Sequence, residues 1–345
     1  MNVLSVSKTN ACLNTLSGIK QRRVVFVDGV YSKELSKAGV WPSGVALDIL
    51  SSGKSVSLSI PDKVVVEELV HILFLTSEAG QKKEPLSYSS DILIHAGAST
   101  RLKIILNDLS TGDRRYESKK NIETRLAPGA CVSFYEVKRG GEGTSVSTKR
   151  FYLKRHSDLD FFEFAEGGDV TRSECEVHFE EEHGFCSLKG LAILDGRSQV
   201  SNRITAFHKV PHCISRQFYK NVLAGKSKTE FNSLVEVVKG ALKSDSRQLN
   251  KNILLSDEAQ AKTGPKLKID ADDVSCTHGA TVGQLEKDEL FYLTSRGLSK
   301  EFARFLLVYG FAEEVLEGME PAGLKEELEA LVNERLKTIM GGSSS

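Results

Sequence analysis

Two residues that can bind a metal ion, Cys276 and His278, stand two positions apart near the C-terminal end of the sequence. Side chains alternate between the two faces of a β-strand, so both would point the same way if this segment is a strand. A thiolate is a soft donor and an imidazole a borderline one, a combination that suits iron. Two donors do not complete a metal site, so further ligands must come from other segments or another chain. A buried thiol beside a hydrogen-bonded histidine is the plainer interpretation of the same pattern.

A second group of candidate ligands contains His208, His212 and Cys213, which lie within six residues. Pro211 interrupts this run, and proline is poorly tolerated inside a sheet. A zinc site here would need a fourth ligand from another segment, for example Cys186. We therefore interpret the segment as a turn with incidental histidines rather than as a metal site.

Acidic residues are concentrated between positions 158 and 182, where ten carboxylates accompany one cation, Arg172. Paired carboxylates can catalyse glycoside hydrolysis, so a polysaccharide-active enzyme is the alternative function. The segment follows a basic stretch, residues 138–155. Neighbouring strands with opposite charges on their solvated faces explain both stretches more simply, and no pair of acids is singled out by its spacing.

Several well-known catalytic motifs are absent from the sequence. Gly225-Lys226-Ser227 resembles the end of a phosphate-binding loop, but the upstream glycine is replaced by Lys220. The sequence also contains no GxSxG or HExxH motif, and no GxGxxG after a predicted strand. We therefore expect no nucleotide to be bound by this chain, and no enzymatic activity.

The elements that would position these residues are mostly short strands. A strand, an Asp28-Gly29 turn and a second strand are expected over residues 24–31. From residue 55 to about 283, short runs alternate polar and apolar residues with a period of two, and turn residues separate them. Gly-Ala recurs beside these runs, which suits the corners of a β-solenoid, although a β-sandwich has similar strands.

Helices are expected only after residue 284. Apolar residues at helical spacing from Phe302 to Tyr309 predict one helix, with Ser299 as its N-cap and Gly310 as its stop. A second apolar stripe runs from Leu324 to Ile339. The predicted organisation is an N-terminal segment (1–54), a solenoid core (55–283), a helical domain (284–340) and a flexible tail (341–345).

Composition limits the class of protein. The 345 residues carry no formal net charge and are 40% hydrophobic, as in an ordinary globular protein, which argues against a nucleic-acid binder. No apolar stretch is long enough for a membrane span. The six cysteines are scattered without a disulfide-like spacing. We expect a reducing compartment, the cytoplasm by default, with the plastid stroma as an alternative.

One long motif resembles a known family. Residues 272–283 read Asp-Asp-Val-Ser-Cys-Thr-His-Gly-Ala-Thr-Val-Gly, and residues 290–298 contain Phe-Tyr-Leu-Thr-Ser-Arg-Gly. Together they are similar to the C-terminal signature of the SufB/SufD family, on its SufD branch. Residues 246–252, His208 with Pro211 and Ser215, and Gly167-Gly168 with Arg172 also match. Residues 25–29 and 34–36 resemble the family's first strand region, so the resemblance covers about residues 24 to 316. The family's N-terminal helical region is missing or shortened here, and Asn202 stands where the family has an aspartate.

The resemblance implies a right-handed parallel β-helix with a C-terminal α-helical domain. It also implies a SufD-like, non-enzymatic scaffold subunit of the SUF iron–sulfur cluster assembly complex. Such a subunit pairs with a SufB-like chain, couples to a SufC-like ABC ATPase, and in isolation can form a homodimer. His278 first, and Cys276 second, are the candidate contributors to a transient Fe-S cluster shared at the subunit interface. The residues expected to dock the ATPase are Phe291, Tyr292, Arg296, Phe302, Phe305 and Leu306.

Overall fold

The computed structural model describes residues 19–37, 39–77, 85–110, 114–320 and 322–341, which form many strands and a short helical region. The strands are β1 (Gln21–Val27), β2 (Val30–Tyr31), β3 (Ala46–Leu50), β4 (Ser55–Ile60), β5 (Leu69–Thr76), β6 (Leu86–Ala96), β7 (Arg101–Ser110), β8 (Tyr116–Leu126), β9 (Cys131–Arg139), β10 (Gly143–Leu153), β11 (Asp158–Glu166), β12 (Val170–Phe179), β13 (Phe185–Leu194), β14 (Gln199–His208), β15 (Ile214–Leu223), β16 (Lys228–Val237), β17 (Asp245–Leu254), β18 (Gln260–Ile269) and β19 (Ser275–Gly283). The helices are η1 (Ser51–Gly53), α2 (Lys287–Ser295), α3 (Lys300–Glu313), η2 (Glu314–Leu316) and α4 (Ala322–Gly341).

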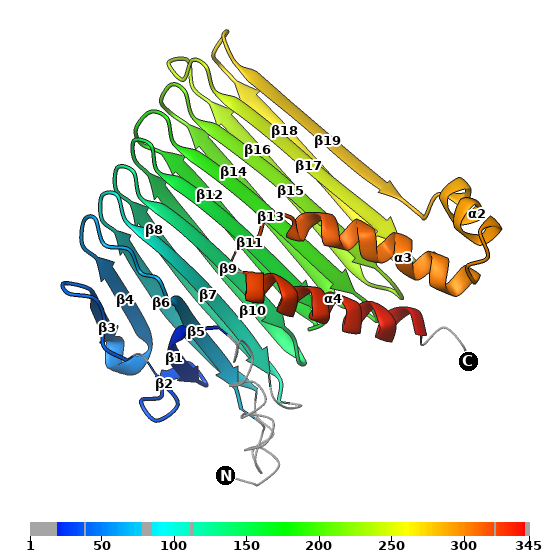
Figure 1. Cartoon of the computed structure of the whole chain (residues 1–345), viewed down its shortest axis with the longest axis horizontal. Helices are drawn as coiled ribbons and strands as arrows, with labels where there is room; N and C mark the ends of the chain where they lie inside the picture. Colours follow the sequence, from blue (N-terminus) through cyan, green and yellow to red (C-terminus); the bar gives the residue numbers. More distant parts are fainter. Residues whose placement is uncertain (1–18, 38, 78–84, 111–113, 321, 342–345) are drawn as a thin grey trace.

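The strands form a β-solenoid of about 7 turns. From β4 onward, successive strands alternate between a nine-stranded and a ten-stranded sheet, and each strand pairs in parallel with the strand two positions away. Figure 1 shows the two sheets as stacked layers whose strands step along the long axis. This alternation excludes the β-sandwich, in which neighbouring strands of a sheet are mostly antiparallel, and confirms the predicted solenoid.

The described chain begins with two antiparallel pairs that join the parallel sheets. β1 and β2 form the predicted hairpin, with Asp28 and Gly29 at φ 52° and 79°, as a tight turn of this kind requires. β1 also pairs in parallel with β5, and β3 pairs antiparallel with β4. Strands β1, β2 and β3 therefore already belong to the two sheets, and the boundary at residues 54 and 55 stays a prediction.

The interior of the solenoid is filled by every second side chain of each strand. On β11, Leu159 and Phe161 are fully buried and point inward. The rings of Phe134, Phe151 and Phe161 come from three different strands, with centroids 5.6–6.1 Å apart. Removing these apolar surfaces from water is the main term that stabilises the coils.

Gly190 on β13 provides a test of this packing. A Cβ atom there would overlap the buried ring of Tyr219 on the next coil. We expect Gly190→Ala to lower the free energy of unfolding by about 1–3 kcal/mol, since overpacking displaces neighbouring side chains. Gly240→Ala is the control, because a Cβ atom there meets no heavy atom within 4 Å. Urea unfolding of both variants measures the difference, and equal midpoints would contradict this account of the packing.

The outer face of the ten-stranded sheet is covered by helices α3 and α4 (Figure 1). Phe162, Phe164, Leu191 and Ile193 point outward from β11 and β13, and they pack against apolar residues of both helices. Both faces of these strands are therefore buried, which explains their almost continuous apolar runs.

Polar contacts hold the end of α3 on the sheet. The ammonium group of Lys220 on β15 donates to the carbonyl oxygen of Phe311 at 2.7 Å and pairs with Glu314. A cation at the C-terminal end of a helix is favoured because the last carbonyl groups there have no partner within the helix.

The predicted helices are largely confirmed. Ser299 caps α3, since its hydroxyl accepts a hydrogen bond from the amide of Phe302. The predicted stop at Gly310 is wrong, because α3 continues to Glu313 where its last turn is buried against the sheet. The apolar stripe from Leu324 is buried along α4 as expected, and that helix ends at Gly341. Residues 342–345 of the predicted tail lie outside the described residues.

Charged side chains are also buried inside the solenoid. The Lys149 ammonium group pairs with Glu136 and, at 3.2 Å, with Glu163, and all three side chains are almost inaccessible to solvent. Burial alone would lower the pKa of Lys149, but the two carboxylates raise it above its usual range. Lys120 and Asp108 form a similar buried pair on the adjacent coil. The core is therefore a mixture of apolar packing and neutralised charge.

Candidate functional site

The last strand, β19, is the open edge of the ten-stranded sheet. It pairs with β17 on one side, and no described strand pairs with its other side. Figure 1 shows it at one end of the solenoid, leading into α2. The Gly279-Ala280 pair, predicted to form a corner, instead lies inside this strand. An open edge presents unpaired backbone donors and acceptors to another chain.

Cys276 and His278 lie on β19 and share its inward-facing side, as the alternation predicts. Cys276 is aligned with Ser246 and His278 with Gln248, and both of these partners on β17 are buried. Cys276 is half-buried, which raises the pKa of its thiol, whereas His278 is exposed. The thiol and the imidazole can therefore approach the same ligand at the open end of the solenoid.

The donor set at this end fits a metal only in part. Within the described ranges, no group of three or more His, Cys, Asp or Glu side chains is arranged to hold a metal ion. One soft and one borderline donor suit iron or an iron–sulfur cluster, but such a group needs about four ligands per iron. The remaining ligands must come from outside this part of the chain.

On the coil next to Cys276 and His278, the inward-facing side chains are polar and form a polar floor under the two candidate ligands. The sequence analysis did not predict this polar floor. The Ser215 hydroxyl contacts the Ser246 hydroxyl at 2.8 Å, one coil below Cys276. Gln248, one coil below His278, donates to Ser233 at 2.6 Å, while its carbonyl oxygen is buried without a hydrogen-bond partner. The signal was present in the sequence: the inward positions of the strands change from Phe and Leu to Ser, Gln and Asn toward this end.

His208 belongs to this floor and not to a zinc site. Its Nε2 atom lies 2.9 Å from the Ser215 hydroxyl, and burial lowers its pKa to about 4. His212 is instead exposed in a turn at φ 60°, and Cys213 is buried with its thiol directed at backbone carbonyls. The interpretation of this segment as a turn with unrelated histidines is consistent with these positions.

The acidic segment 158–182 spans β11, β12 and the start of the following turn, and six of its ten carboxylates form ion pairs with basic side chains. Glu166 pairs with Arg139 at 2.6 Å, and Glu176 pairs with Arg150 at 3.2 Å. Glu163 points inward to Lys149. Opposite charges on neighbouring coils thus account for these residues, which argues against glycoside hydrolysis.

Exposed apolar side chains gather on the short helix α2. Phe291 is 72% exposed and Tyr292 is 55% exposed. The guanidinium group of Arg296 lies 4.7 Å from the centre of the Tyr292 ring, so a cation and an aromatic ring form one surface feature. Such a patch is typical of a protein-binding surface.

The predicted docking residues on α3 divide into two groups. Phe302 is 50% exposed and Leu306 is 37% exposed, so both are available to a partner. Phe305 is partly buried and stacks on Tyr309 with ring centroids 5.9 Å apart. It also packs against the apolar residues buried between the helices and the ten-stranded sheet. Phe305 thus packs within this chain, whereas the sequence pattern grouped it with the residues expected to contact the ATPase.

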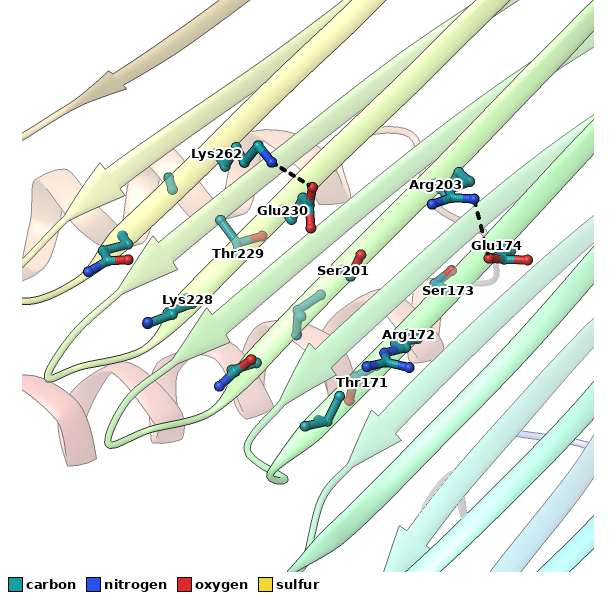
Figure 2. A pocket seen from close by; sticks show the side chains of 15 residues that line it. Thr171, Arg172, Ser173, Glu174, Ser201, Arg203, Lys228, Thr229, Glu230 and Lys262 are labelled. Atoms are coloured by element: carbon teal, nitrogen blue, oxygen red, sulfur yellow. Dashed lines mark ion pairs between the residues drawn. The ribbon is translucent and has the colours of Figure 1, made fainter.

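A separate hollow lies on the outer face of the nine-stranded sheet. It has a volume of about 610 Å³ and is lined by residues 170–174, 199–201, 203, 228–230 and 260–262. Figure 2 shows Arg172 and Lys228 on this face without an ion pair, while Arg203 pairs with Glu174 and Lys262 with Glu230. We call this hollow the basic groove.

Among the described residues, no helix combines the length and the apolar character needed to cross a membrane.

The comparisons with known proteins agree on one family. The family model described as "SUF system FeS cluster assembly, SufBD core domain" matches residues 77–311. The chain is 26% identical to the iron–sulfur cluster assembly protein SufD of Escherichia coli, over 96% of this chain and 83% of that protein. It is 34% identical to SufD of Bacillus subtilis, over 96% and 78%. It is 28% identical to a SufBD family protein of Synechocystis, over 91% and 77%.

Proposed function

Because the chain belongs to the SufB/SufD family of SUF iron–sulfur cluster assembly proteins, we propose that it is a SufD-like scaffold subunit of that complex. It pairs with a SufB-like chain, is coupled to a SufC-like ATPase, and works in the cytoplasm. The observation that carries the proposal is the position of Cys276 and His278 side by side on the open edge strand β19. An incomplete donor set at an unpaired edge suits a transient cluster completed by a second subunit.

The two edge strands at this end differ in how well they accept another strand. The nine-stranded sheet ends in β18, which carries Lys262, Pro265, Lys266 and Lys268. Lysine and proline on an edge strand discourage pairing with another chain. β19 contains small and neutral residues besides His278. This contrast supports strand addition of the partner at β19, directly beside the two candidate ligands.

Co-purification tests the proposed assembly. The tagged chain, co-expressed with a SufB-like chain and a SufC-like ATPase from the same genome, should recover both of them in a fixed ratio. Recovery of the tagged chain alone, or only as a homodimer, would contradict the proposal. The measurement is gel electrophoresis of the affinity-purified sample together with its mass by light scattering.

The exposed aromatic residues of α2 and α3 are the proposed ATPase contact. We expect Phe291→Glu combined with Phe302→Glu to abolish co-purification of the ATPase, because buried carboxylates without a partner oppose association. The thermal midpoint should remain unchanged, since both side chains are at least half exposed. Point substitutions are needed, because deleting the helices would uncover Phe162, Leu191 and their neighbours.

Leu93→Glu is the matched control for this pair. Leu93 is 42% exposed on β6 and lies on the solenoid, away from the helices. It should leave ATPase recovery intact. Loss of the ATPase in the control, or its retention in the double variant, would refute the assignment of α2 and α3 as the contact.

A further inference from the structure

In the basic groove on the nine-stranded sheet, two cations, Arg172 and Lys228, form no ion pair with the two carboxylates that line it, since Glu174 pairs with Arg203 and Glu230 with Lys262. Elsewhere on this outer face, Arg150 pairs with Glu176 at 3.2 Å and Lys268 with Glu236 at 2.7 Å. Arg172 is flanked in register by Val146 and Ser201, both uncharged. Lys228 is flanked by Gln199 and Gln260, also uncharged. Within the described part of the chain, neither cation takes part in an ion pair.

The groove is positively charged in a chain of zero formal net charge. Its lining contains four cations (Arg172, Arg203, Lys228 and Lys262) and two carboxylates (Glu174 and Glu230), so the difference is +2. Both carboxylates are already engaged, Glu174 by Arg203 at 3.9 Å and Glu230 by Lys262 at 3.2 Å. The surplus charge therefore rests on Arg172 and Lys228, with the hydroxyl of Ser201 and two glutamine amides beside them.

The lining indicates which anion fits. It contains no aromatic side chain on which a nucleotide base could stack. Strands β12, β14 and β16, which carry Arg172, Ser201 and Lys228, each pair with a neighbour on both sides, so their backbone amides do not form the anion-binding nest typical of phosphate sites. Arg172 and Lys228 are two strands apart and also two residues apart in register, which separates their backbones by about 12 Å at the usual strand spacing and rise. The positive charge is thus extended rather than focused on one point.

We propose that the basic groove binds an acidic, extended peptide segment of a partner protein. In an extended chain, side chains on one face repeat about every 6.6–6.8 Å. Carboxylates at alternate positions of such a segment can reach Arg172 and Lys228 together, because both cations have long flexible side chains. Gln199 and Ser201 on β14 supply neutral hydrogen-bonding groups between the two charges, and Gln260 on β18 supplies another beyond Lys228. This assignment rests on the groove alone and is independent of the proposed scaffold function.

Fluorescence anisotropy with a labelled peptide of alternating glutamate and serine tests the proposal. The full chain should bind this peptide at low ionic strength, and binding should weaken as salt is added. Arg172→Glu combined with Lys228→Glu should weaken binding on the order of tenfold or more, because two cations become repulsive anions. The matched control is Arg247→Glu, since Arg247 is exposed on the opposite sheet and, among the described residues, takes part in no ion pair.

Each outcome decides the proposal. Loss of binding in the double variant but not in Arg247→Glu supports the groove as the peptide site. Equal binding by the double variant and the unaltered chain overturns it. Displacement of the peptide by an equal concentration of inorganic phosphate also overturns it, in favour of a phosphate-bearing ligand. Unchanged unfolding midpoints of all variants show that the substituted chains remain folded.

Discussion

Lys149→Met should lower the free energy of unfolding by about 3–5 kcal/mol, because it leaves a buried carboxylate without its cation. The Lys149 ammonium group pairs with Glu136, and it contacts Glu163 at 3.2 Å and the Ser173 hydroxyl at 2.8 Å. Glu136 retains a second cation, Lys138, at 3.3 Å. Glu163 keeps only neutral donors, so it becomes the uncompensated charge. Urea unfolding of the purified chain measures the loss.

The adjacent residue supplies the control. Arg150 points outward and pairs with Glu176 at 3.2 Å, with both side chains substantially exposed. Arg150→Met should therefore change the free energy of unfolding by no more than about 1 kcal/mol. Similar losses in Lys149→Met and Arg150→Met would show that burial does not set the cost.

A second substitution identifies the source of the loss. Asn202 at 2.7 Å and Tyr219 at 3.0 Å both donate to one oxygen of Glu163, and these contacts survive in Glu163→Gln. Adding Glu163→Gln to Lys149→Met removes the orphan charge and should recover about 1 kcal/mol or more. No recovery would mean that lost packing, rather than the unpaired carboxylate, destabilises the variant.

His278→Ala should reduce the iron and sulfide content of the purified complex on the order of tenfold or more, as expected when a metal ligand is removed. His278 is exposed on the edge strand, so the substitution should change the free energy of unfolding by no more than about 0.5 kcal/mol. Iron and acid-labile sulfide are measured on the same preparation whose thermal midpoint is recorded. Normal iron content would eliminate the ligand role.

Thr277→Ala is the control for this experiment, since Thr277 is the neighbouring exposed residue and points to the opposite face of β19. It should retain iron and sulfide. If His278→Ala instead lowers the thermal midpoint and iron content in proportion, the imidazole has a structural role. Cys276→Ala addresses the second candidate ligand in the same assay.

The sequence by itself determined the solenoid strands through apolar alternation, the first hairpin through Asp28-Gly29, and the two long C-terminal helices through apolar residues at helical spacing. These features depend on local chemistry: a period of two for strands, left-handed turn residues, and an N-cap hydroxyl at Ser299. The same alternation placed Cys276 and His278 on one face of a strand. The motif around them also identified the family, which the comparisons confirm.

Only the tertiary structure decided which face of each strand or helix is buried and which residues it contacts. Lys149 and Arg150 are adjacent basic residues, yet one is buried among carboxylates and the other is solvated. Phe305 and Leu306 are adjacent apolar residues, yet Phe305 packs inward while Leu306 stays 37% exposed. The basic groove likewise depends on register, which sets Arg172 beside Val146 and Ser201. Residues about 30 positions apart become neighbours only when the coils stack, and no local pattern encodes which side chain the next coil brings.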